Sequence, residues 1–84
     1  MEIFAKRLKE VRKMRKLPQF ELGRRIGFGY TYISNLETGH SAPDLDTLVK
    51  LARTLDISIR YLLGDTDEME DYNQNKIDSV HKND

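Results

Sequence analysis

Two short segments with helical spacing, separated by only three residues, constrain this chain more than any other feature. Apolar residues recur at helical intervals over residues 19–26 and 30–38, and Gly–Phe–Gly at 27–29 connects the two segments. So short a connection forces two helices to cross steeply. Gly23 lies on the inner face of the first helix, where it costs about 1 kcal/mol relative to alanine. Close approach of the second helix explains that cost, so we expect a tight unit of two helices and a turn.

The rest of residues 1–64 also favours helices. Only Pro18 and Pro43 interrupt this part of the chain, and it shows no strand-like alternation. We expect three further helices: one over residues 3–16, one that begins at the N-cap Asp44, and a short one between the N-cap Ser58 and Gly64. The apolar residues of the first and fourth helices are Phe4, Leu8, Val11, Leu45, Leu48, Leu51, Ala52 and Leu55. The predicted fold class is all-α, a compact bundle of five helices.

Charge is distributed unevenly along a chain whose formal net charge is zero. Residues 1–64 hold 12 Lys and Arg against 7 Asp and Glu, a net charge of +5, whereas residues 65–84 hold 2 against 7, a net charge of −5. This pattern predicts a basic domain over residues 1–64 and an acidic tail over residues 65–84. The few apolar residues of the tail cannot build a core, so we expect it to be largely flexible. A sixth helix that docks on a partner is the alternative.

The composition also argues against several classes of protein. A chain of 84 residues predicts one domain and leaves little room for a substrate cavity. It has no cysteine, and no apolar stretch approaches the length of a signal peptide core or a membrane span. We therefore expect a soluble, cytoplasmic protein without membrane contact. Because no phosphate-binding glycine loop, metal-ligand cluster or nucleophile–base pair is visible, we expect no enzymatic activity, no cofactor and no metal.

The segment 30–38 has two chemically different faces. Ile33, Leu36 and Glu37 share the face that points into the domain. The opposite face is polar but uncharged, and it carries Tyr30, Thr31, Ser34, Asn35 and Thr38. Hydroxyl and amide groups on an exposed helix are suited to reading base edges in the major groove of DNA. The sequence therefore predicts that this helix contacts double-stranded DNA.

Two charged residues fall on apolar faces. Arg12 follows Phe4 and Leu8 at steps of four residues, and Glu37 follows Ile33 by four. Either charge alone in the core would be costly. We expect the two to pair and so to tie the first helix to the third, because such residues are rarely buried without a partner. The alternative is that both side chains turn outward into solvent.

At this point a family resemblance is clear. The run LPQFELGRRIGFGYTYISNLETG over residues 17–39 resembles the helix-turn-helix of the Xre and lambdoid phage repressor family, the Cro/C1 type. The run PDLDTLVKLARTLDIS over residues 43–58 resembles the fourth helix of that family and its exit. The resemblance spans about residues 4–64. It implies a five-helix domain that binds a palindromic DNA operator as a homodimer, and a transcriptional regulator that acts as a repressor.

The resemblance also implies roles for individual residues. Tyr30, Thr31 and Asn35 occupy base-reading positions, and Ser34 shares their face. Gln19 corresponds to a residue that contacts phosphate and supports the recognition helix, and the Arg12–Glu37 pair has a counterpart in the family. The other residues that we expect at the DNA backbone are Arg24, Arg25, Thr38, His40 and Ser41. Lys6, Lys9, Lys13 and Lys16 on the first helix can form a DNA-facing stripe, but a solvated helix face explains them equally well and is favoured for most of them. For His40 the alternative is simple solvation, which is usual for a lone loop histidine.

Four positions depart from the family pattern. Pro18 replaces the usual serine or threonine cap of the second helix, and Gly23 replaces the usual alanine. Phe20 stands where a polar residue is usual, either as a surface aromatic, which we favour, or as a wedge against DNA. Tyr30 is an unusual base reader, so contact with phosphate or stacking is its alternative role.

The dimer contact is expected away from the groove-facing helix. Ile59, Arg60 and Tyr61 on the fifth helix are the candidates, since tyrosine and arginine are common at such contacts. The tail can extend this interface through Tyr72, Ile77 and Val80, or it can remain free. Two rival functions stay open: an antitoxin or other module whose tail binds a protein partner, and a restriction–modification controller protein.

Overall fold

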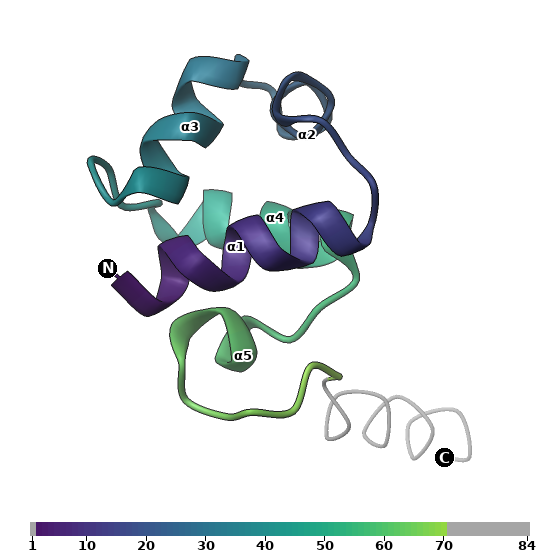
Figure 1. Ribbon diagram of the computed structural model, residues 1–84, viewed down its shortest axis with the longest axis vertical. Helices are drawn as coiled ribbons and strands as arrows, with labels where there is room; N and C mark the ends of the chain where they lie inside the picture. The colour runs from purple at the N-terminus through teal and green to yellow at the C-terminus, as the bar shows by residue number, and fades with distance from the viewer. Residues whose placement is uncertain (1, 71–84) are drawn as a thin grey trace.

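The computed structural model describes residues 2–70, which form five helices and no strand (Figure 1). The helices are α1 (Glu2–Met14), α2 (Gln19–Ile26), α3 (Tyr30–Thr38), α4 (Leu45–Leu55) and α5 (Ile59–Leu63). Within this part of the chain, no helix is both long and apolar enough to cross a membrane. The expected five-helix, all-α architecture is confirmed.

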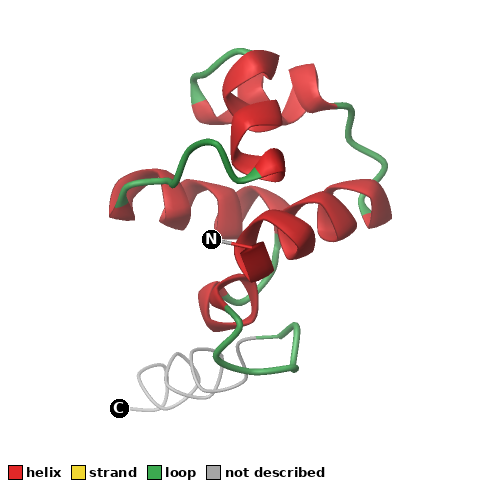
Figure 2. Ribbon diagram, turned by 60° about the vertical axis from the view of Figure 1, so that its left-hand side comes forward, coloured by secondary structure: helices red, strands yellow, loops and turns green. Residues whose placement is uncertain are grey.

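The helices are arranged around a middle pair. Both views show α1 and α4 in the middle of the domain, with α2 and α3 on one side and α5 on the other (Figures 1 and 2). One core joins all five helices, and its fully buried side chains are Phe4, Leu8, Val11, Leu22, Ile33, Leu36, Leu51, Leu55 and Leu62. Helices this short are marginal in isolation, so packing of their apolar faces on this shared core holds them in place.

The helix ends follow the local chemistry of the sequence. The Asp44 carboxylate accepts a hydrogen bond from the Thr47 amide at 2.8 Å, and the Ser58 hydroxyl accepts one from the Tyr61 amide at 3.3 Å. Pro18 makes no side-chain cap on α2, as its chemistry predicts. The expected end of α1 is wrong by two residues: Lys16 has φ of 58°, and the Leu17 amide donates to the Arg12 carbonyl, so the helix stops at Met14.

Two features of the fold differ from the sequence pattern. Leu45 fits the apolar periodicity of α4, but it is 75% exposed and lies outside the core. Periodicity fixes the direction of a side chain on its helix, but it does not provide a neighbour to cover that side chain. The second difference concerns residues 65–70, which contact the domain instead of leaving it. The remaining tail, including Tyr72, Ile77 and Val80, lies outside the described residues.

Candidate nucleic-acid interface

The connection between α2 and α3 is held by backbone contacts. Gly27 closes α2 with φ of 87°, a conformation that costs glycine little, and the Phe28 amide donates to the Gly23 carbonyl at 2.7 Å. A Cβ atom on Gly23 would lie 2.7 Å from the Phe28 carbonyl oxygen and 2.8 Å from that of Gly29. Gly23 is therefore required for a close approach, as its position predicts. The neighbour that comes close is the turn itself and not the body of α3.

A buried polar cluster fixes α3 against α1 and α2. Arg12 and Glu37 form the pair that their positions predict, with Nε–Oε2 and Nη2–Oε1 distances of 2.6 and 3.0 Å. The side chains are only 10% and 2% exposed. Arg12 also donates to the Leu17 carbonyl, and the Gln19 amide group donates to Glu37 Oε1 at 3.1 Å. The paired geometry satisfies both charges and ties α3 to α1 and to the start of α2.

The outer face of α3 is free to meet a ligand. Ile33 and Leu36 are fully buried, whereas Thr31 is exposed and Ser34 and Asn35 are half-buried. The side chains of Thr31, Ser34 and Asn35 make no hydrogen bonds within residues 2–70, so their donors and acceptors remain available. Tyr30, the first residue of α3, is 61% exposed. The four predicted base readers thus share one helix and one accessible face.

Aromatic residues surround the start of α3. The Phe28 and Tyr32 rings stack with their centroids 4.2 Å apart and their planes 22° from parallel. Tyr32 is partly buried against the core, while Phe28 remains exposed. Phe20 on α2 is also exposed, which fits both a surface aromatic and a wedge against DNA. The sequence pattern gave no indication of the Phe28–Tyr32 stack, because their relation depends on the path of the turn.

The two arginines of α2 share one carboxylate. Glu21 Oε2 accepts from Arg24 Nη2 at 2.6 Å and from Arg25 Nε at 2.8 Å. These hydrogen bonds, that of Arg24 first, lower the pKa of Glu21 from 4.5 to about 2. The Arg24 side chain is largely exposed, and that of Arg25 is about half exposed. Glu21 was not among the predicted site residues, although its spacing of three and four residues from the arginines is the usual signal for such pairs on a helix.

The end of α3 and the following loop form a local hydrogen-bonded group. The Thr38 hydroxyl lies 2.6 Å from His40 Nδ1 and donates to the Ser34 carbonyl at 3.0 Å. The Ser41 amide donates to the Asn35 carbonyl at 3.1 Å. Thr38 and His40 are exposed. The loop that follows α3 is therefore folded back on it, with its polar groups near the C-terminal end of the helix.

The fifth helix offers less free surface than the sequence suggests. Tyr61 is only 9% exposed and belongs to the core, and the Arg7 guanidinium lies 4.1 Å from its ring centre. Ile59 is half-buried, and Arg60 is exposed with its Nε 2.8 Å from Asp65 Oδ2. Tyr61 therefore has little surface left for a partner, because its side chain completes the core of its own domain.

Residues 65–70 are tied to α1 and α5. Arg7 Nη1 donates to the Thr66 carbonyl at 2.6 Å, and Arg7 Nη2 pairs with Asp67 at 2.8 Å. The Ser58 amide donates to the Met69 carbonyl at 2.8 Å, and Met69 packs against the core. Residues 66–69 therefore contact the domain that was predicted to end at Gly64, and the boundary itself stays a prediction. Arg7 was not among the predicted site residues, and no local spacing distinguishes it from the other cations of α1.

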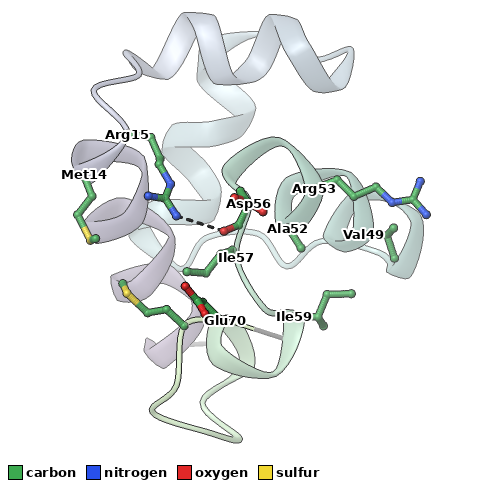
Figure 3. A pocket seen from close by; sticks show the side chains of 10 residues that line it. Met14, Arg15, Val49, Ala52, Arg53, Asp56, Ile57, Ile59 and Glu70 are labelled. Carbon is green, nitrogen blue, oxygen red and sulfur yellow. Dashed lines mark hydrogen bonds between the residues drawn. The ribbon is translucent and has the colours of Figure 1, made fainter. Parts of the chain in front are cut away.

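An open groove of about 690 Å³ lies at the end of α1, between α4 and residues 69–70 (Figure 3). Apolar side chains line part of it, and the Arg15 guanidinium donates to the Asp56 carbonyl at its edge. Of the predicted site residues, only Ile59 lines this groove. Within residues 2–70, no group of His, Cys, Asp or Glu is arranged to hold a metal ion.

Known proteins share both the sequence and the arrangement described above. A family model described as Helix-turn-helix matches residues 8–62. The transcriptional regulator ImmR of Bacillus subtilis is 39% identical over 69 residues, which cover 82% of this chain and 54% of ImmR. The chain spans little more than half the length of the first curated relatives that it matches.

Two solved structures are similar over about three quarters of the chain. The P22 c2 repressor, in complex with a synthetic operator, superposes with a TM-score of 0.69 at 29% identity, over 74% of this chain and 94% of that one. The restriction–modification controller protein C.AhdI from Aeromonas hydrophila superposes with a TM-score of 0.68 at 34% identity, over 73% of this chain and 92% of that one. Together with the family match and the geometry of α2 and α3, these similarities show that the chain belongs to the Cro/C1-type helix-turn-helix family.

Proposed function

We propose that this protein is a sequence-specific regulator of transcription that represses by binding a palindromic operator in double-stranded DNA as a homodimer. One observation carries the proposal: the outer face of α3 presents unpaired hydroxyl and amide groups, while a buried ion pair fixes the inner face. Uncharged hydrogen-bonding groups held in place before binding are suited to a major groove. The P22 c2 repressor, which has been solved with an operator, shares this fold.

Base reading is assigned to Tyr30, Thr31, Ser34 and Asn35. The Asn35 amide can make paired hydrogen bonds to one base edge, and the hydroxyls of Thr31 and Ser34 can donate or accept. Thr38, His40 and Ser41 follow at the end of α3, where they meet the DNA backbone in this proposal. Gln19 contacts phosphate through an amide group that already supports Glu37.

Arg24 and Arg25 are assigned to contacts with the DNA backbone, in which they exchange their carboxylate partner for phosphate. Both bind the Glu21 carboxylate, and a phosphate group offers them the same kind of acceptor. Contact with DNA therefore replaces one anion with another and does not order a free side chain. Such contacts position the protein on DNA and leave sequence discrimination to α3.

Dimerisation is assigned to α5, on the side of the domain opposite to α2 and α3 (Figure 1). Ile59 and Arg60 supply the accessible surface, and Tyr61 supports it from within the core. A single helix reads only a few base pairs, so a second copy is needed to reach operator specificity. Truncation after Glu70 with measurement of mass in solution tests this assignment: an intact dimer assigns the contact to the domain, and a monomer assigns it to residues 71–84.

Selection of binding sites from random DNA tests the proposed function directly. We expect a two-fold symmetric consensus with half-sites one helical turn apart, about 34 Å. The variant Asn35→Ala should lose about 1–3 kcal/mol on the selected site and relax preference at one base pair. Equal loss on selected and random DNA would assign Asn35 to phosphate or to structure, and enrichment of no sequence would refute specific binding.

A restriction–modification controller is the second candidate function. The similarity to C.AhdI over 73% of the chain favours it. Both functions use the same interface, so binding sites selected from random DNA do not separate them. The genomic position of the selected site does: a site upstream of restriction and modification genes indicates a controller. A site elsewhere supports the repressor.

A further inference from the structure

The open groove at the end of α1 leaves apolar side chains in contact with water (Figure 3). Its apolar lining consists of Met14, Val49, Ala52, Ile57, Ile59 and Met69. Met14 is 53% exposed, and Val49 and Ile59 are half-buried. Apolar surface that stays open to water over several neighbouring residues commonly marks a docking site. The groove therefore has a surface that a further segment of chain can cover.

The chain itself leads into this groove. The Ser58 amide donates to the Met69 carbonyl at 2.8 Å, and Met69 packs against the core. Met69 and Glu70 both line the groove, and residues 71–84 follow directly. An extended chain covers at most about 3.3–3.6 Å per residue, so Tyr72 starts no more than about 7 Å from Glu70. The following segment is thus tethered at the edge of the groove.

The apolar residues of this segment need an existing surface. Tyr72, Ile77 and Val80 are too few to build a core among themselves. Burial of a side chain of this size is favourable wherever a neighbouring apolar surface is available. The groove is such a surface, and it lies where the segment begins.

The charges of the segment suit the same site. Asp67, just before the segment, already pairs with Arg7 of α1 at 2.8 Å. Arg53 lines the groove, is exposed, and its guanidinium makes no hydrogen bond or ion pair within residues 2–70. Asp71 and Asp78 supply carboxylates in the segment that follows. An acidic stretch that is already held by one cation of its own domain thus continues toward a second cation.

We propose that residues 71–84 dock in the groove of their own chain, with Tyr72, Ile77 and Val80 against its apolar side chains. A short tether gives the segment an effective concentration in the millimolar range at this site, so weak contacts suffice. A segment from a second copy lacks this advantage. For that reason the occupant is the segment that starts at the edge of the groove.

Docking has a consequence for the proposed dimer. Ile59 lines the groove and is also the accessible apolar residue of α5. A docked segment therefore covers surface that a second copy needs, so it opposes dimerisation. This consequence rests on the proposed function, whereas the docking itself does not.

Methionine methyl resonances of the full chain test the docking. Met14 lines the groove but is distant in sequence from residues 71–84, and a Tyr72 ring packed nearby shifts its methyl resonance. We expect Tyr72→Ala and Ile77→Ala each to move the Met14 resonance, measured with isotope-labelled methionine. Ile77→Val, which removes one carbon, should lower the equilibrium constant of folding about fourfold. Asn83→Ala is the control and should change neither quantity.

Dilution identifies the occupant. Docking within one chain predicts that the Met14 difference between wild type and Ile77→Ala persists at the lowest protein concentration. The proposal is overturned if neither variant moves the Met14 resonance, or if the difference disappears on dilution, which would assign the groove to a second copy. Sedimentation measures the consequence separately, since Ile77→Ala should dimerise at lower concentration than wild type. Equal dimerisation together with a moved resonance would contradict the α5 contact and support the docking.

Discussion

Two clusters of arginine and glutamate in this domain use the same chemical groups in different surroundings. In the buried cluster, the Arg12 and Glu37 side chains are 10% and 2% exposed, and both join α1 to α3. In the exposed cluster, Glu21 holds Arg24 and Arg25 on the surface of α2, within one helix. The buried pair connects elements far apart in sequence, whereas the exposed group connects neighbours on a single turn.

The difference in surroundings decides what each cluster can do. A buried pair cannot exchange its partner without leaving a charge unsolvated, so it acts on the structure. An exposed group in water contributes little to stability, because solvent competes for the same charges. Its arginines can therefore exchange carboxylate for phosphate at low cost. Four predictions test this contrast, each on one of the two clusters.

Removal of one partner from the buried pair should have the largest effect. Glu37→Ala leaves Arg12 buried without a carboxylate, and we expect the free energy of unfolding to fall by about 3–5 kcal/mol. Denaturation with urea, followed by circular dichroism, measures it. Glu10→Ala on the exposed face of α1 is the control and should change stability by less than about 0.5 kcal/mol. Equal midpoints for Glu37→Ala and wild type would contradict the structural role.

Loss of the third member of the buried cluster should cost less. Gln19→Ala removes one hydrogen bond to the Glu37 carboxylate, and we expect a loss of about 1.5 kcal/mol in unfolding free energy. The DNA affinity of this variant separates the structural role of Gln19 from a role in phosphate contact. If Gln19 also contacts phosphate, affinity falls equally for selected and random DNA, even in conditions where the variant is fully folded. Unchanged affinity would leave Gln19 with a structural role alone.

The exposed cluster should respond in DNA binding and not in stability. Arg25→Ala should weaken binding similarly for all sequences and reduce the slope of log affinity against log salt concentration by about 1. Lys50→Ala provides the comparison, because it removes a similarly exposed cation from an ion pair on α4. Its salt slope should match the wild type. If the two variants have the same slope, Arg25 does not contact phosphate.

The smallest effect concerns acid stability. Hydrogen bonds from Arg24 and Arg25 lower the pKa of Glu21 from 4.5 to about 2 in the folded protein. Its contribution to folding is therefore fully present above pH 4.5 and is lost as the pH falls toward 2. Glu21→Gln should flatten the dependence of stability on pH within this window, which denaturation at a series of pH values measures. Parallel curves for variant and wild type would show that the exposed cluster does not persist in solution.

The sequence alone was sufficient for the local features of the fold. The bounds of α2 and α3, the caps at Asp44 and Ser58, and the need for glycine at position 23 all depend on residues close together in the chain. The pairing of Arg12 with Glu37 crosses 25 residues, but it could still be predicted. Two charges on apolar faces each need a partner, and they have few other ways to be satisfied. The pair could therefore be predicted without knowing the distance between the two residues.

Tertiary structure decided what depends on the path of the chain between elements. Whether Leu45 is covered, whether Tyr61 faces a partner or its own core, and whether Phe28 stacks on Tyr32 each require the position of a distant neighbour. Arg7 shows this most clearly, because its partners lie 54 to 60 residues away and its surroundings in sequence are those of any surface cation. Periodicity tells which way a side chain points from its helix. Only the packed fold determines what lies there, since that depends on how every other element is placed.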